Sequence, residues 1–363
     1  MGHLLSSFNN RMTRDQKDTD YSRFLESRDK DFDTSRAFLV LSMILAHVFE
    51  SFYAPNFNRH YILFIGKGFV FLAGFTAGAI YAERFAEAPF IYFKKFFKSA
   101  VKLIFIFLIC NIGIMLIRSD RQSSFAQHPT AHLVKSLLLG LDQSLFGFDI
   151  LVPISITIFL SCFILSLRAR AWTLPVIVLL LVSIWFSEKF ASFDLRGMQF
   201  TLVGLIGTLT GKWISSLNWY VVMERFSASG KNIWVIVFIL FYYALLVLFT
   251  NKYTRIAFSP HVLPTVALLY AVYVISRRLD LTKVVGCQII TMFLSRYMLF
   301  AYLFHIALIN FLFLIIPRKG LAFIPTCGVA IFVLGLTLVC SYLLDYSNKQ
   351  FLFSRRLYDL AFK

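Results

Sequence analysis

The sequence predicts an all-α, polytopic integral membrane protein with about ten transmembrane helices and both termini in the cytoplasm. Its composition is far from that of a soluble protein: 58% of the 363 residues are hydrophobic, 15% are charged and the mean hydropathy is +0.72, whereas soluble domains average about 25% charged residues. Its apolar residues also gather in runs close to the length that a membrane-spanning helix needs, about 20 residues. A chain of this length then has no room for a second, globular domain.

Ten apolar stretches follow a polar N-terminal segment, and we interpret each stretch as one spanning helix. Because that N-terminal segment is polar and charged, the first stretch is expected to be retained as a helix rather than cleaved as a signal peptide. Several stretches are short for a spanning helix, the eighth most of all. The stretches are 37–54, 61–82, 99–117, 150–167, 172–188, 199–216, 232–250, 261–276, 298–316 and 322–343.

The positive charges give the orientation. With ten spans both termini share one side, and that side carries most of the 36 Lys and Arg residues, as cytoplasmic segments do. The chain then divides into a flexible polar tail (1–30), a membrane domain (31–348) and a short basic tail (349–363). Segments 118–149 (outside) and 277–297 (inside) contain patterns that suit helices lying on the membrane surface.

The net charge and the positions of the cysteines limit which binding partners are expected. A net charge of +17 favours contact with the lipid bilayer and with anionic ligands. The basic residues are scattered over loops, which argues against nucleic acid as a partner. The five cysteines lie inside apolar runs without metal-ligand spacing, so we interpret them as buried apolar side chains and expect neither a metal site nor a disulfide. They are Cys110, Cys162, Cys287, Cys327 and Cys340.

An arginine and a histidine in the first span are the strongest candidates for a functional site. Arg36 and His47 are eleven residues apart. Eleven helical steps make three turns plus about 20°, so both side chains lie on one face, about 16 Å apart along the axis. Ionisable groups inside a membrane are costly, which favours a functional role. His47, at mid-depth, would act as a general base near neutral pH.

Two acidic residues flank this pair. Asp33, three residues before Arg36, is either a helix N-cap with an interfacial charge or a part of the same site. Glu50, three residues after His47, is within helical reach of the imidazole and would orient it or pair with its charge. The alternative for Glu50 is an interfacial carboxylate near the outer end of the span.

The second span combines small residues with a lysine. Gly66, Gly74 and Gly78 are spaced at multiples of four, which favours close packing against another helix. Lys67 either extends its apolar stem to bring its charge to the interface or lines a cavity, where it would contact an acyl group.

A row of lysines precedes and enters the third span. Lys95, Lys98 and Lys102 are three and four residues apart, so they share one helix face. Such residues are ordinary in segments that face the cytoplasm, and they also suit a clamp for a nucleotide pyrophosphate. Arg277 and Arg278, on another cytoplasmic segment, would join this clamp.

The ninth span holds a second intramembrane histidine. His305, with Tyr302 one turn before it, is flanked by apolar residues. Its imidazole either hydrogen-bonds across helices or, with Tyr302, contacts the acyl group or the acceptor. Four other histidines lie in or near segments on the outer side, without a constellation that supports a role: His60, His128, His132 and His261.

The pattern Arg36-x10-His47, preceded by Asp33, resembles the acyltransferase-3 superfamily of ten-helix membrane enzymes. The chain looks like the OpgC branch of that superfamily, the glucan biosynthesis C proteins, which succinylate periplasmic glucans. The resemblance extends over the whole length in helix number and orientation. The resemblance in sequence is most specific over 27–98 and 294–305.

Two positions depart from the family pattern. Ala73 stands where the family usually has a serine, which removes a hydroxyl group. Lys95 and Lys98 stand where it usually has two arginines, which keeps the charge but loses the bidentate fork. These departures bear on the acyl group more than on the type of reaction.

The resemblance implies a membrane-bound O-acyltransferase of the bacterial inner membrane. It would move a succinyl or acetyl group from cytoplasmic acyl-CoA, its co-substrate, to a hydroxyl group of a periplasmic or cell-surface glucan or other polysaccharide, without a bound cofactor. His47 would deprotonate that hydroxyl or carry the acyl group transiently. Lys67 would hold the free carboxylate of a succinyl group. Asp33, Arg36, Lys95, Lys98 and Lys102 would form the donor site.

Two other functions fit the same composition. A glycan transporter or flippase would also have many helices and few buried charges. A structural or sensory partner of a glycan synthase would tolerate the loss of both Arg36 and His47. The aligned pair beside a basic cytoplasmic mouth favours the enzyme.

Overall fold

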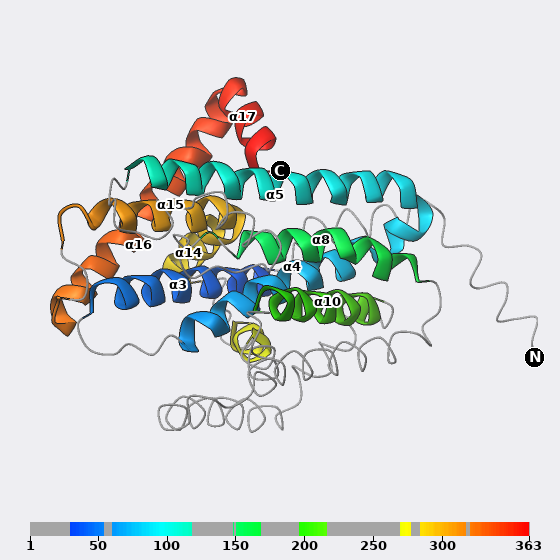
Figure 1. Cartoon of the computed structure of the whole chain (residues 1–363), viewed down its shortest axis with the longest axis horizontal. Helices are drawn as coiled ribbons and strands as arrows, with labels where there is room; N and C mark the ends of the chain where they lie inside the picture. Colours follow the sequence, from blue (N-terminus) through cyan, green and yellow to red (C-terminus); the bar gives the residue numbers. More distant parts are fainter. Residues whose placement is uncertain are drawn as a thin grey trace, which may run out of the picture.

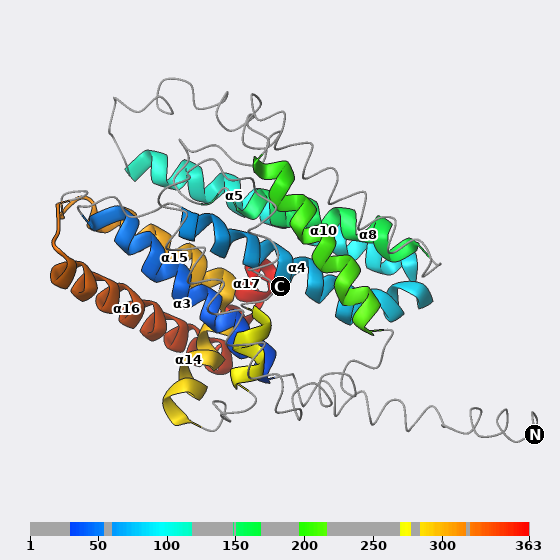
Figure 2. The ribbon, with the colours of Figure 1, turned by 90° about the horizontal axis from the view of Figure 1, so that it is seen from below.

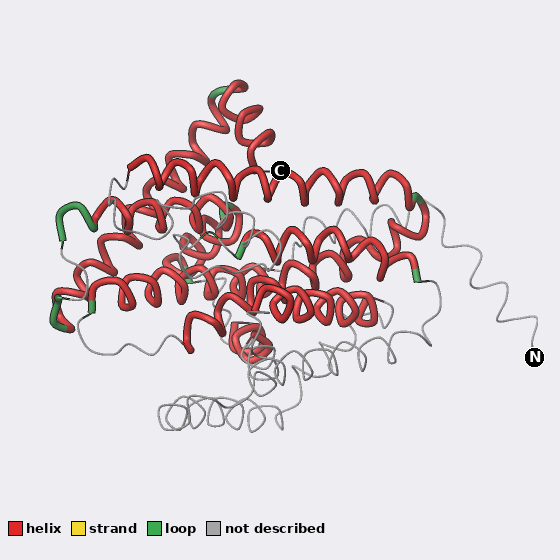
Figure 3. Tube along the Cα trace, in the orientation of Figure 1, coloured by secondary structure: helices red, strands yellow, loops and turns green. Residues whose placement is uncertain are grey.

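The structure is a computed structural model that describes residues 30–53, 60–117, 148, 150–167, 196–215, 269–276, 284–316 and 320–362. Within these ranges it is all-helical, as the sequence predicts, and short turns join neighbouring helices (Figures 1 and 3). The helices are α3 (Lys30–Phe52), α4 (His60–Glu87), α5 (Pro89–Ile117), α8 (Leu151–Ser166), α10 (Arg196–Ser215), α14 (Val285–Arg296), α15 (Met298–Leu312), α16 (Phe323–Gln350) and α17 (Leu352–Phe362).

Several of these helices are built to cross a membrane. Among the described residues, α3, α4, α5 and α16 are long and apolar enough, and α14 with α15 forms a fifth candidate with an 89° bend. Helix α8 is apolar but has only 16 residues. The protein is therefore an all-helical membrane protein with four to five candidate spans in the part of the chain that the structure describes. The predicted spans 172–188 and 232–250 lie outside that part.

Helix ends extend beyond the predicted spans. Helix α5 begins at Pro89, ten residues before the predicted start at 99, so Lys95 and Lys98 lie inside the helix and not in a segment before it. Helix α16 continues to Gln350, and α17 folds most of the predicted C-terminal tail. Hydropathy marks where a chain is apolar, whereas a helix continues wherever its backbone bonds and its neighbours support it.

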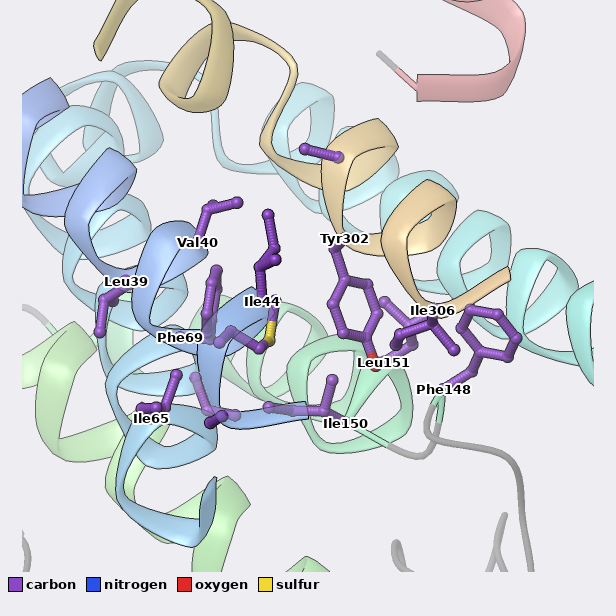
Figure 4. Packing of buried hydrophobic residues seen from close by; sticks show 14 of the residues in the cluster. Leu39, Val40, Ile44, Ile65, Phe69, Phe148, Ile150, Leu151, Tyr302 and Ile306 are labelled. Atoms are coloured by element: carbon purple, nitrogen blue, oxygen red, sulfur yellow. The ribbon is translucent and has the colours of Figure 1, made fainter. Parts of the chain in front are cut away.

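Helix α4 lies between two groups of helices (Figure 2). On one side it packs against α8 and α10, with α5 covering α8. On the other side it contacts α3, which also packs against α14, α15 and α16. The largest apolar cluster joins the groups, with Ile44 of α3, Phe69 of α4, Leu151 of α8 and Ile306 of α15 among its members (Figure 4).

Small residues bring α4 and α10 into backbone contact. A Cβ added to Gly74 would overlap the carbonyl oxygen of Gly204, and one added to Gly78 would overlap that of Thr208. Gly207 of α10 faces the Phe71 carbonyl in the same way. The prediction that the glycines of the second span serve packing is confirmed, including Gly66, whose Cβ would lie 2.8 Å from a ring carbon of Phe200.

Buried hydroxyl groups and a partly buried amino group tie α8 to its neighbours. The Ser155 hydroxyl donates to the Ala100 carbonyl of α5 at 2.8 Å, and the Ser161 and Thr208 hydroxyls are 2.8 Å apart. The amino group of Lys212 on α10 donates to the Ile164 carbonyl in the last turn of α8 at 2.9 Å. The cation thus satisfies a helix terminus that has no further turn to bond.

The bend between α14 and α15 lies at Tyr297. The Tyr297 hydroxyl donates to Asp345 of α16 at 2.7 Å. Arg296 and Lys349 form ion pairs with the same carboxylate at 3.1 and 2.7 Å. The prediction of a helix within 277–297 is confirmed by α14, while its position on the membrane surface stays a prediction.

The cysteines agree only in part with their predicted burial. All five are free thiols. Cys162 is buried, whereas the other four are partly exposed. An apolar side chain on a spanning helix is equally stable against lipid, so an apolar run does not distinguish the lipid-facing side from the interior.

Candidate functional site

Arg36 is held by two neighbours near the start of α3. One guanidinium nitrogen contacts Asp33 Oδ1 at 3.2 Å, and the other donates to Thr76 Oγ1 of α4 at 2.9 Å. The side chains of Arg36 and Asp33 are 16% and 17% exposed. Because α3 already begins at Lys30, the N-cap interpretation of Asp33 is wrong, and Asp33 belongs with Arg36.

Thr76 is a member of this cluster that the sequence reasoning missed. It lies in the glycine-rich part of α4, three residues after Ala73. A hydroxyl in a stretch otherwise made of small and apolar residues is the only signal that would have singled it out. Its partner, 40 residues earlier in the sequence, follows from how α3 and α4 pack.

His47 lies deeper along the same helix, next to a second imidazole. Helix α3 is unbroken from Lys30 to Phe52, so the predicted separation of about 16 Å from Arg36 applies. The ring centroid of His47 is 5.5 Å from that of His305 on α15, with the rings tilted by 35°. The structure thus brings together two histidines that the sequence places in the first and ninth spans.

His305 is the more deeply buried of the two, with no exposed surface. Its Nδ1 lies 2.8 Å from the Ala301 carbonyl of its own helix, so its hydrogen bond does not cross to another helix. Its Nε2 is buried and has no hydrogen-bond partner among the described residues. The Tyr302 ring stands nearly edge-on to the imidazole at 5.8 Å. Tyr302 is itself buried and belongs to the largest apolar cluster (Figure 4).

Lys67 and Glu50 differ in their surroundings. Lys67 is only 3% exposed, which favours a charge kept inside the helix assembly over one that extends to the interface. It lies nine residues before Thr76, about 13 Å along α4, and is therefore close in depth to His47. Glu50, one turn beyond His47 on α3, is partly exposed.

The lysine row of α5 lies at the same end of α4 as Arg36 but on a different face. The Lys95 amino group is 4.9 Å from the centre of the Tyr81 ring. Tyr81 follows Thr76 by five residues, about 7 Å along the axis and about 140° around it. Arg84, which the sequence reasoning missed, also approaches Tyr81, at 6.0 Å. Lys98 is exposed and Lys102 is partly buried.

Other candidates remain untested by the structure. Arg277, Arg278 and the outer histidines His128, His132 and His261 lie outside the described residues. Within the described ranges there is no group of three or more His, Cys, Asp or Glu side chains placed to hold a metal ion.

No protein-family model matches the chain, and no curated protein or solved structure matches it.

Proposed function

We propose that the protein is a membrane-bound O-acyltransferase that moves a succinyl or acetyl group from cytoplasmic acyl-CoA to a hydroxyl group of a periplasmic or cell-surface polysaccharide. The observation that carries this proposal is the position of His47. It lies deep in an unbroken spanning helix, beside a second buried imidazole, on the helix face that also holds Arg36. An ionisable group at that depth is a functional-site candidate, and a donor from one side and an acceptor hydroxyl from the other would both meet at it.

The donor would enter at the Arg36 end of α3. Asp33 and Thr76 hold the guanidinium at two points, so its orientation is set before a phosphate group arrives. Lys95 and Lys98, at the same end of α4 but on another face, would add positive charge near this entry. The pantetheine arm would then run along α3 for about 16 Å and bring the thioester to His47.

The chemistry needs one base at the thioester. His47 would take the proton of the acceptor hydroxyl while the hydroxyl oxygen attacks the thioester carbonyl carbon. The new C–O bond forms, the C–S bond breaks, and the thiolate of CoA takes the proton from the imidazolium and leaves as the thiol. In a two-step version the imidazole carries the acyl group between donor and acceptor.

Lys67 would select a dicarboxylic acyl group. It is buried and close in depth to His47, and its charge would pair with the free carboxylate of a succinyl thioester. An acetyl group offers no such partner. Substituting Lys67 by Gln is therefore expected to lower the rate with succinyl-CoA and to leave the rate with acetyl-CoA nearly unchanged.

The test uses purified protein in liposomes with radiolabelled succinyl-CoA or acetyl-CoA and an oligosaccharide glucan acceptor. CoA release and label on the glucan are followed for wild type, His47→Ala and the control His3→Ala, which alters a histidine in the predicted tail. We expect His47→Ala to lower transfer by about 10²-fold or more and His3→Ala to have no effect. Folded wild-type protein that neither binds a donor nor releases CoA would overturn the proposal and favour a glycan transporter or flippase.

A further inference from the structure

We propose that His305 is a positioning residue for His47. Its Nε2 accepts a hydrogen bond from one ring nitrogen of His47 and so leaves the other His47 nitrogen with the lone pair that acts as base. This assigns His305 a role apart from contact with the acyl group or the acceptor. The kinetic part of the proposal rests on the acyl-transfer function proposed above.

The hydrogen bonding of His305 fixes its protonation. A carbonyl oxygen only accepts hydrogen bonds, so the Nδ1 that lies 2.8 Å from the Ala301 carbonyl carries a proton. His305 is fully buried and has no carboxylate partner among the described residues, so the neutral form is favoured, because an unpaired charge would be costly there. Nε2 therefore holds a lone pair and is a hydrogen-bond acceptor.

That acceptor has no partner among the described residues, which is uncommon for a buried polar atom. Among the described residues the ring of His47, which offers a donor, lies with its centroid 5.5 Å from that of His305. A ring nitrogen lies about 1 Å from its centroid, so two nitrogens that face each other across this gap would be roughly 3 Å apart, the length of a hydrogen bond. A rotation of the His47 ring would form the bond, and hydrogen bonds in active sites commonly tighten only when substrate binds.

An imidazole suits this role inside a membrane. The tautomer of a histidine is set by the bond that its other nitrogen makes, and the usual partner is a carboxylate or a backbone carbonyl. A neutral imidazole performs the same task without adding a buried charge. The edge-on ring of Tyr302 limits how far His305 can turn.

Two amide substitutions distinguish the roles of the two ring nitrogens of His305. In His305→Gln the amide oxygen reaches the place of Nε2 and can accept from His47. In His305→Asn the shorter amide reaches only the place of Nδ1, where it keeps the bond to Ala301. We expect kcat to stay within about tenfold of wild type for Gln and to fall by roughly 10- to 100-fold for Asn, with KM for acyl-CoA unchanged in both.

Every other pattern counts against the proposal. Transfer activity in His305→Asn but not in His305→Gln would show that His305 serves only the bond to Ala301. Full activity in both variants would remove any role for Nε2. Loss of activity in both variants, from protein that elutes and melts like wild type, would mean that an imidazole is required and that His305 carries a proton instead of accepting a hydrogen bond.

A second measurement does not depend on turnover. Nitrogen NMR of protein labelled with ¹⁵N-histidine reports the tautomer of His47, whose signals are identified by their absence in His47→Ala. We expect one tautomer in wild type and in His305→Gln, and a mixture in His305→Asn. If wild type releases no CoA from either donor, the acyl-transfer function fails, but this measurement still decides whether His47 is hydrogen-bonded to His305. A mixture of His47 tautomers in wild type would overturn that hydrogen bond.

Discussion

The hydroxyl group of Thr76 helps to orient the charged guanidinium of Arg36. It accepts a hydrogen bond from Arg36 at 2.9 Å, while Asp33 holds the other side of the guanidinium. Thr76→Val keeps the shape and removes the acceptor. A hydrogen bond to a charged group that is partly exposed contributes about 1 kcal/mol, so we expect Kd for acyl-CoA to rise roughly fivefold with kcat nearly unchanged.

The measurement for Thr76 is a titration of donor binding to the purified protein. Thr76→Ser, which keeps the hydroxyl, serves as the control and should bind like wild type. A rise in Kd for Thr76→Ser without one for Thr76→Val would mean that packing of the threonine methyl group, and not its hydroxyl, is what matters.

The sequence predicted the members of the site better than their contacts. The spacing of Arg36 and His47 needs only helix geometry, and an unbroken α3 provides it. The contact of His47 with His305 depends on how the first and ninth spans lie and rotate against each other, and no periodicity within one span contains that information. The same holds for the bond from Arg36 to Thr76.

Close packing of α4 against α10 is the clearest feature at the scale of the element. The sequence singled out the glycines of α4 but not those of α10, because a row of small residues identifies one surface and not its partner. The bend at Tyr297 was missed for a related reason. Tyr297 bonds there to the buried carboxylate of Asp345, which comes from α16, 48 residues later.

Gly74→Ala tests the α4–α10 contact. The added Cβ would overlap the Gly204 carbonyl oxygen, and because that atom belongs to a backbone, the two helices must move apart. Overpacking of this kind costs about 1–3 kcal/mol, so we expect the Tm in detergent to fall by several degrees.

Gly113→Ala on α5 is the matched control, since a Cβ there has nothing within 4 Å. Alanine favours a helix by roughly 0.5–1 kcal/mol over glycine, so this variant should melt at the same temperature as wild type or slightly above it. Equal Tm values for the two variants would contradict the close approach of α4 and α10.

At the scale of the whole molecule, the helix ends that meet agree with consecutive helices that cross one membrane in opposite directions. The start of α3 meets the second half of α4 through Arg36 and Thr76, as consecutive antiparallel helices require. The opposite end of α3 meets the start of α16, where the Leu321 amide donates to the Phe52 carbonyl at 3.0 Å. The alternating direction of successive spans could be predicted, because it needs only a count of spans. Which helices become neighbours could not be predicted in this way.

Labelling of single cysteines tests this arrangement in the membrane. In a variant without the five native cysteines, Gly320→Cys lies at the end where α3 and α16 meet, and Lys349→Cys lies at the opposite end of α16; both positions are exposed. The positive charges around Lys349, with Arg296 beside it, predict that this end faces the cytoplasm. A maleimide that cannot cross membranes should therefore label Gly320→Cys in spheroplasts and reach Lys349→Cys only after the membrane is opened. The reverse pattern would invert the orientation and with it the side from which acyl-CoA enters, while labelling of both from one side would mean that α16 does not span the bilayer.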